Sequence, residues 1–217
     1  MGQSPDNMPY DPSTSVTEQV HASIKFSLHN LRPSDASGSA DEAYIDMLIL
    51  HSPLQTLAQT VEAWSACESY VPHRIRNLGI SNCTLPILQG LASKVNVPPA
   101  VVQNRFYIST RFDVPLRAFC RDNDIIYQSF WTLTANPELA RSNPVQQLAS
   151  QANTSPAAAL YSLVLGLGQT TVLNGTTNKE HMVADLAAPK QVGRLAEEQP
   201  AWWSKVLAEF QQLVGDL

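Results

Sequence analysis

One short segment limits the folds open to this chain more than any other. The residues from Tyr44 to Pro53 read YIDMLILHSP, an Ile- and Leu-rich run that ends in a single histidine. Such a run, followed by a proline, is typical of a buried parallel strand. Parallel strands in barrel enzymes carry functional side chains at their C-terminal ends. His51 stands at that end, so it is the first candidate for a site residue.

Four later segments repeat this pattern of a short apolar run that ends in polar or aromatic residues. With the first segment, they predict strands near residues 44–50, 76–81, 100–105, 125–130 and 170–174. Helical patterns alternate with these strands at residues 54–70, 84–94, 113–122 and 156–167. Alternating strands and helices predict a parallel sheet, and this rhythm is typical of a (β/α) barrel.

The two ends of the chain add further helices. A serine followed three residues later by a glutamate forms a capping box, which predicts a helix over residues 15–31. Val20, Ile24 and Leu28 recur at helical spacing, and we expect them to pack on the strand layer. Other helical segments are expected at 137–151, from about 178 and from 200.

In this order and spacing, the segments resemble the aldo-keto reductase family, nearest to a fungal-type branch. The matching runs contain LILHSP, RNLGISN, VVQNR and YQSFWTLTANP. The resemblance covers roughly residues 8–190 and implies an α/β fold, an incomplete (β/α) TIM-type barrel that lacks the first strands. We treat residues 1–217 as one such domain. Of the family's catalytic tetrad, only His51 can be placed, because the family carries the Asp, Tyr and Lys on earlier strands.

The resemblance also implies where a nicotinamide would bind. Ser81, Asn82 and Gln103 match the family residues that hydrogen-bond the carboxamide, a group with both a donor and an acceptor. Phe130 matches the aromatic residue on which the family stacks the nicotinamide ring. Simple strand-end capping for the polar residues, and core packing for Phe130, stay open as alternatives.

The segment that would grip the adenosine 2′-phosphate departs from the family's pattern. Thr176 stands at the hydroxyl position, but Gly175 replaces a lysine, His181 an arginine and Asp185 an asparagine. Loss of the two cations removes charge-assisted contacts to a phosphate. The start of the following helix is still expected to offer backbone N–H donors. The cofactor is therefore expected to be absent or a weakly bound NADP.

Arg105, Tyr107 and Trp131 are further site candidates without support from a family motif. Arg105 is the last residue of a predicted strand and Tyr107 follows it, and both are assigned with His51 as candidate catalytic residues. Trp131 is assigned to the substrate pocket as an apolar wall. Strand alternation predicts that Phe130 and Trp131 point to opposite faces.

Composition excludes several partners. The chain of 217 residues has a formal net charge of −5 and no basic stripe, which argues against nucleic acid. The three cysteines lie far apart without metal-binding spacing, and no run is long and apolar enough to cross a membrane. We expect a cytoplasmic protein with a small-molecule substrate. Because five strands are too few to close a barrel, we also expect a homodimer or higher homo-oligomer.

Three hypotheses for the function stay open. The favoured one is an enzyme that lacks most of the tetrad and performs cofactor-independent proton transfer on a small hydrophobic carbonyl compound. It would be an isomerase, cyclase or dehydratase, with fungal secondary metabolism as the setting. The alternative is an NADP-dependent carbonyl oxidoreductase completed by oligomerisation. The third is a non-catalytic partner protein or a gene fragment.

Overall fold

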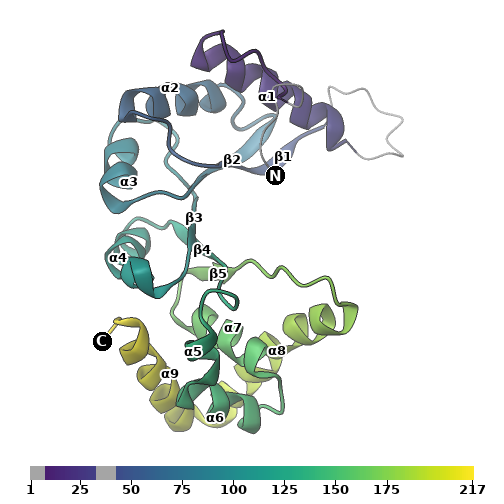
Figure 1. The fold of residues 1–217 in the computed structure, drawn as a ribbon, viewed down its shortest axis with the longest axis vertical. Coiled ribbons are helices and arrows are strands. Elements are labelled where there is room, and N and C mark those ends of the chain that lie inside the picture. Colours follow the sequence, from purple (N-terminus) through teal and green to yellow (C-terminus); the bar gives the residue numbers. More distant parts are fainter. Residues whose placement is uncertain (1–7, 33–42) are drawn as a thin grey trace. The chain divides into compact units, whose positions relative to one another are not determined.

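The computed structural model describes residues 8–32 and 43–217, which fall into two compact units (Figure 1). Unit 1 ends at Val101 and unit 2 begins at Val102. The order of the strands, β1-β2-β3-β4-β5, follows the order of the chain. The five predicted strands are thus confirmed. The assignment of one domain to the whole chain stays a prediction.

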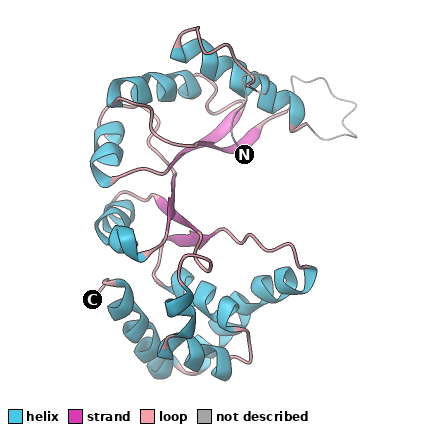
Figure 2. Ribbon diagram, in the orientation of Figure 1, coloured by secondary structure: helices cyan, strands magenta, loops and turns pink. Residues whose placement is uncertain are grey.

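Unit 1 combines a parallel strand pair with helices, which Figure 2 colours magenta and cyan. Its elements are α1 (Val16–Asn30), β1 (Ile45–Leu50), α2 (Leu57–Glu68), β2 (Ile75–Ser81) and α3 (Leu85–Ala92). The two strands pair in register from Ile45 opposite Ile75 to Leu50 opposite Ile80. Both strands therefore end at the same edge, where His51 follows β1.

Local sequence signals fix where the helices of unit 1 begin. The predicted capping box starts α1, since the Ser15 side chain accepts from the backbone of Glu18 and the Glu18 side chain accepts in return. Ile24 and Leu28 of α1 are buried, as predicted, and α1 packs along α2. Trp64 of α2 is also buried, and its indole N–H donates to the carbonyl of Val97 over 2.9 Å.

Unit 2 holds the remaining strands and most of the helices. Its elements are β3 (Val101–Arg105, whose first residue closes unit 1), a 3-10 segment (Ile108–Asp113), α4 (Val114–Asp122), β4 (Ile126–Phe130), α5 (Pro137–Arg141), α6 (Asn143–Gln151), α7 (Pro156–Gly166), β5 (Thr170–Val172), α8 (Lys179–Glu198) and α9 (Pro200–Val214). Strands β4 and β5 are parallel, with Tyr127 opposite Thr170. The helical region predicted at 137–151 is two helices, α5 and α6, which meet at Ser142.

The core of unit 2 contains a buried charge as well as apolar side chains. Helix α7 is buried over most of its middle part, from Ala158 to Leu160 and from Ser162 to Val164, and Leu160 and Leu163 are fully inaccessible. Arg117 of α4 is 1% exposed, and its guanidinium bonds both carboxylate oxygens of Asp216, over 2.7 and 2.9 Å. Its Nε donates to the carbonyl of Phe112. This pairing ties the end of the chain to α4.

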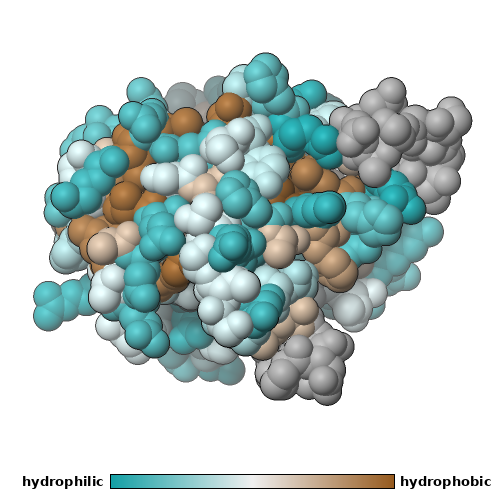
Figure 3. All heavy atoms as spheres, turned by 90° about the horizontal axis from the view of Figure 1, so that it is seen from above, coloured by the Kyte–Doolittle hydropathy of each residue, from teal (hydrophilic) through white to brown (hydrophobic). Residues whose placement is uncertain are grey.

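The surface carries hydrophobic side chains in small groups among hydrophilic ones, as the face in Figure 3 shows. In unit 1, the large hydrophobic side chains that are exposed include Phe26, Leu31 and Tyr44. Across residues 8–32 and 43–217, no helix has the length and apolar character needed to cross a membrane. Scattered exposed hydrophobic residues are common on folded proteins and need no special function.

Candidate functional site

In unit 1, three predicted site residues lie together where β1 and β2 end. His51 is exposed, and its backbone carbonyl accepts a hydrogen bond from the Asn82 side chain over 2.9 Å. The same amide nitrogen lies 3.2 Å from the hydroxyl of Ser81, which is buried. Asn82 has a φ of 52°, a left-handed conformation that asparagine tolerates better than most residues. The amide of Asn82 therefore ties the two strand ends together.

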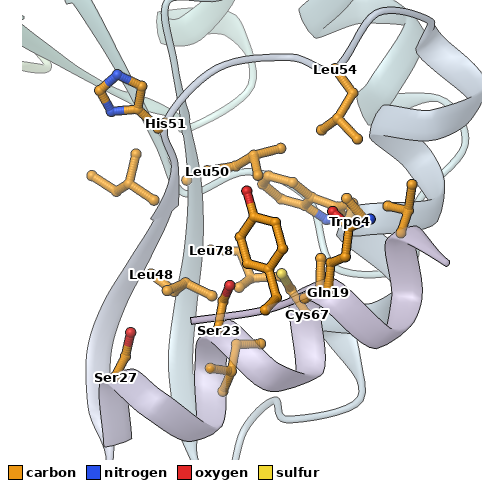
Figure 4. A pocket seen from close by; sticks show the side chains of 17 residues that line it. Gln19, Ser23, Ser27, Leu48, Leu50, His51, Leu54, Trp64, Cys67 and Leu78 are labelled. Atoms are coloured by element: carbon orange, nitrogen blue, oxygen red, sulfur yellow. The ribbon is translucent and has the colours of Figure 1, made fainter. Parts of the chain in front are cut away.

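A cavity of about 420 Å³ opens beside these residues in unit 1 (Figure 4). Its walls come from α1, β1, α2 and β2 and are mostly aliphatic, with Trp64 as the largest side chain. Tyr10 and His51 both belong to the lining. Figure 4 shows the imidazole of His51 on the far side of the strand from Trp64, so it stands at the rim and not in the apolar interior.

A second cavity, of about 650 Å³, lies in unit 2 and gathers four of the predicted residues. Phe130, Trp131, Thr176 and His181 all line it. Tyr161 of α7 also lines it, and burial, together with the charge of Asp185, raises the pKa of this phenol. Nothing in the sequence singled out Tyr161, because its position on the inner face of a helix carries no motif.

Residues 174–185 form one end of this cavity. This end carries the carboxylate of Asp185, and several of its polar groups make hydrogen bonds to one another. Asp185 lines the cavity and accepts a hydrogen bond from the side chain of Asn174. The Asn178 side chain caps α8 by accepting from the backbone N–H groups of Glu180 and His181, over 2.8 and 3.1 Å. The prediction that the start of α8 offers open donors to an anion is wrong for these two N–H groups, because the capping asparagine already uses them.

The prediction that Phe130 and Trp131 point to opposite faces is also wrong. Strand β4 ends at Phe130, and Trp131 has a φ of 55°, so strand alternation does not extend to it. Both rings line the same cavity, and they meet edge to face with their centroids 6.4 Å apart. Trp131 thus lines this cavity with 55% of its surface exposed, and its assignment to a substrate pocket stays a prediction.

The remaining predicted residues of unit 2 lie on β3 or directly after it. The Gln103 side chain donates to that of Gln128 over 2.7 Å. The guanidinium carbon of Arg105 lies 5.1 Å from the ring centroid of Tyr107 and 3.9 Å from that of Trp131. Arg105 and Tyr107 are therefore neighbours of the second cavity's aromatic wall.

Two of the three cysteines are poorly suited to thiol chemistry, and the described residues offer no metal-binding cluster. Among residues 8–32 and 43–217, no cluster of three potential metal ligands occurs. Burial raises the pKa of both Cys67 and Cys120 to about 12, so these thiols stay protonated at neutral pH. A protonated thiol is a poor nucleophile and a poor metal ligand.

Comparison with known proteins identifies the family. The sequence model of the Aldo/keto reductase family matches residues 11–207. The chain belongs to the aldo-keto reductase family. It is 27% identical over 130 residues to 2,5-diketo-D-gluconic acid reductase B of a Corynebacterium species, a match that covers 59% of this chain and 46% of the relative. It is also 27% identical over 119 residues to the NADPH-dependent alpha-keto amide reductase of Saccharomyces cerevisiae, covering 52% and 35%. The matches thus span about half or less of these two relatives.

Solved structures confirm the predicted fold class, an incomplete barrel of the aldo-keto reductase type. The thermostable aldo-keto reductase Tm1743 superposes with a TM-score of 0.65 at 20% identity, covering 80% of this chain and 61% of that one. A variant of Gox0644 in complex with NADPH superposes with a TM-score of 0.64 at 19% identity, covering 86% and 62%. At such identities, the likeness concerns the fold and not the activity.

Proposed function

We propose that the protein acts on a small hydrophobic carbonyl compound by proton transfer, without dependence on NADP. The main support for the independence from NADP is the end of the unit 2 cavity formed by residues 174–185. There Asp185 accepts a hydrogen bond from Asn174, and Asn178 caps α8. Among the described residues that line this cavity there is no lysine or arginine, and Asp185 belongs to the lining. A 2′-phosphate placed there would meet the carboxylate of Asp185, and among the described lining residues only the imidazole of His181 could pair with it, so the residues present fit NADP poorly.

His51 is the group that would carry the proton. Its ring is exposed at the rim of the apolar cavity in unit 1, where it can exchange protons with solvent. Imidazole accepts a proton when neutral and donates one when charged. His51 would take a proton from a carbon next to the carbonyl, and the electron pair would move onto the carbonyl oxygen. Where a C=C bond lies next to that carbon, the electron pair moves back from the oxygen and the proton adds at the far end of the C=C bond, which completes an isomerisation. The same first step begins a cyclisation or a dehydration.

Proton exchange in heavy water tests this proposal. We would incubate the protein with small hydrophobic ketones and follow deuterium uptake next to the carbonyl by NMR. His51→Gln is expected to slow the exchange by about 10²–10⁴-fold, the usual contribution of a general acid or base. His73→Gln changes another exposed histidine of unit 1 and is expected to leave the rate unchanged. Equal exchange by wild type and His51→Gln would contradict the proposal.

A second candidate is a carbonyl reductase that uses a dinucleotide without the 2′-phosphate. The hydrogen-bonded pair of Asn174 and Asp185 favours it, because a carboxylate accepts hydrogen bonds from ribose hydroxyls as readily as it repels phosphate. Phe130 and Trp131 would provide flat walls for a planar ring. When bound, such a cofactor supplies hydride to a carbonyl carbon.

Binding of the two reduced dinucleotides separates the candidates. Saturable binding of NADH with weaker binding of NADPH, followed by oxidation of NADH with an aldehyde, would support the reductase. Binding of neither, together with deuterium exchange that depends on His51, supports proton transfer. Tight binding of NADPH would contradict both proposals. If neither NADH nor NADPH binds and no deuterium exchange occurs, the hypothesis of a non-catalytic partner protein would be favoured.

A further inference from the structure

Arg105 carries a charge that the described residues leave without a counter-ion. None of the three ion pairs found in residues 8–32 and 43–217 includes it. Its Nε atom is buried and makes no hydrogen bond in the structure. Arg117 in the same unit differs from Arg105, because its buried guanidinium forms a bidentate pair with the carboxylate of Asp216. Burying an N–H donor of a cation without a hydrogen bond costs free energy, unless a bound ligand supplies the missing acceptor.

Aromatic rings surround the Arg105 guanidinium in place of acceptors. Its central carbon lies 3.9 Å from the ring centroid of Trp131, 5.1 Å from that of Tyr107 and 5.9 Å from that of Phe130. Cation–π contacts of this kind offset part of the desolvation but satisfy no N–H donor. A guanidinium that lies against a ring face keeps its in-plane N–H edge free for a ligand.

We propose that Arg105, Tyr107 and Trp131 form a binding site in unit 2 for a planar carboxylate, the anion of an aromatic or conjugated acid. The fork of the guanidinium matches the two oxygens of a carboxylate, as the pair of Arg117 and Asp216 illustrates. The indole of Trp131, which is 55% exposed, offers an open apolar face for the flat body of the ligand. This site does not depend on the proton transfer proposed for His51.

Paired ligands that differ only in charge test the site. We would titrate the full chain with 2-naphthoate and with its neutral amide, 2-naphthamide, and follow binding by calorimetry. Wild type is expected to bind the carboxylate about 10–100-fold more tightly, the usual gain from a charge-assisted hydrogen bond. Arg105→Gln is expected to abolish this preference. Arg194→Gln removes an exposed arginine of α8 and is expected to retain it.

Two further measurements keep the inference falsifiable. Arg105→Lys keeps the positive charge but loses the planar fork, so it is expected to show a reduced preference, and it replaces Arg105→Gln if that variant does not fold. Inorganic phosphate is expected to compete poorly with 2-naphthoate. Equal affinity of wild type for acid and amide, an unchanged preference in both Arg105 variants, or full displacement by phosphate at matched concentration would each overturn the planar-carboxylate site.

Discussion

At the residue scale, the surroundings of each charged side chain determine what it does. The buried guanidinium of Arg117 pairs with Asp216, whereas that of Arg105 lies against aromatic rings and its buried Nε makes no hydrogen bond. The carboxylate of Asp185 lines the cavity of unit 2, where it would repel a bound phosphate. Substitutions at Asp216 and Asp185 are therefore expected to change different quantities, the free energy of unfolding in the first case and dinucleotide affinity in the second.

Removing the charge of Asp216 should strongly destabilise the protein. Asp216→Asn leaves the Arg117 guanidinium buried without its counter-ion, and we expect a loss of about 3–5 kcal/mol in the free energy of unfolding. Glu138→Gln is the matched control, because the ion pair of Glu138 and Arg141 is exposed and its loss should cost less than about 1 kcal/mol. Denaturant unfolding measures both. Equal effects of the two changes would show that the buried pair adds no stability.

Restoring the family's residues at the acidic end of the cavity should create NADPH binding. The double variant His181→Arg, Asp185→Asn adds a cation and removes the repelling carboxylate. We expect NADPH affinity to rise by about 10–100-fold, because a charge-assisted hydrogen bond to phosphate contributes about 1.5–3 kcal/mol. NADH affinity should change much less, since NADH has no 2′-phosphate. A parallel rise for both dinucleotides would show that the substitutions act elsewhere than at the phosphate.

At the element scale, α1 shows how one helix both stabilises unit 1 and shapes its cavity. The capping box fixes its start, and its buried face places Ile24 and Leu28 inside the unit. Val20 and Ser23, from the same helix, line the cavity next to β1. The helix therefore forms one wall of the space at whose rim His51 lies.

Truncation of the buried face of α1 should destabilise unit 1. Ile24 is 2% exposed, and its change to alanine should lower the free energy of unfolding by roughly 2–5 kcal/mol. Phe26→Ala, on the same helix but 54% exposed, should have little effect. Thermal unfolding followed by circular dichroism compares the two variants. An Ile24→Ala protein with the melting temperature of wild type would show that α1 is not docked.

At the scale of the whole molecule, β1 ends the strand order, so among the described residues its outer edge has no neighbouring strand. An uncovered strand edge is a template for pairing with another chain. The apolar side chains of Leu48 and Leu50 line the cavity beside this edge. We therefore propose that copies of the chain associate.

Light scattering coupled to size exclusion tests association directly. The chain has a mass of 23.8 kDa, and we expect a species of at least twice that mass. Asp46→Pro, at an exposed position of β1, removes a backbone donor and should weaken pairing at that edge. A folded species of 23.8 kDa at all protein concentrations would contradict the prediction.

The order of the elements could be predicted from the sequence with little error. Helix α7 was predicted over 156–167 and spans Pro156–Gly166, because the Ser155 cap and the following proline are local signals. The strand ends that carry His51, Ser81 and Asn82 were predicted for the same reason. Periodicity, caps and turn residues act over a few positions, and local sequence contains them.

The sequence by itself thus determined the alternation of strands and helices, the family and the residues at the strand ends. Only the tertiary structure decided what surrounds those residues. The rings of Phe130 and Trp131 beside Arg105 and the carboxylate of Asp185 in the cavity depend on contacts between segments distant in sequence. A left-handed residue after β4 was enough to overturn strand alternation. Side-chain environment depends on packing in three dimensions, and the local pattern of a sequence does not contain it.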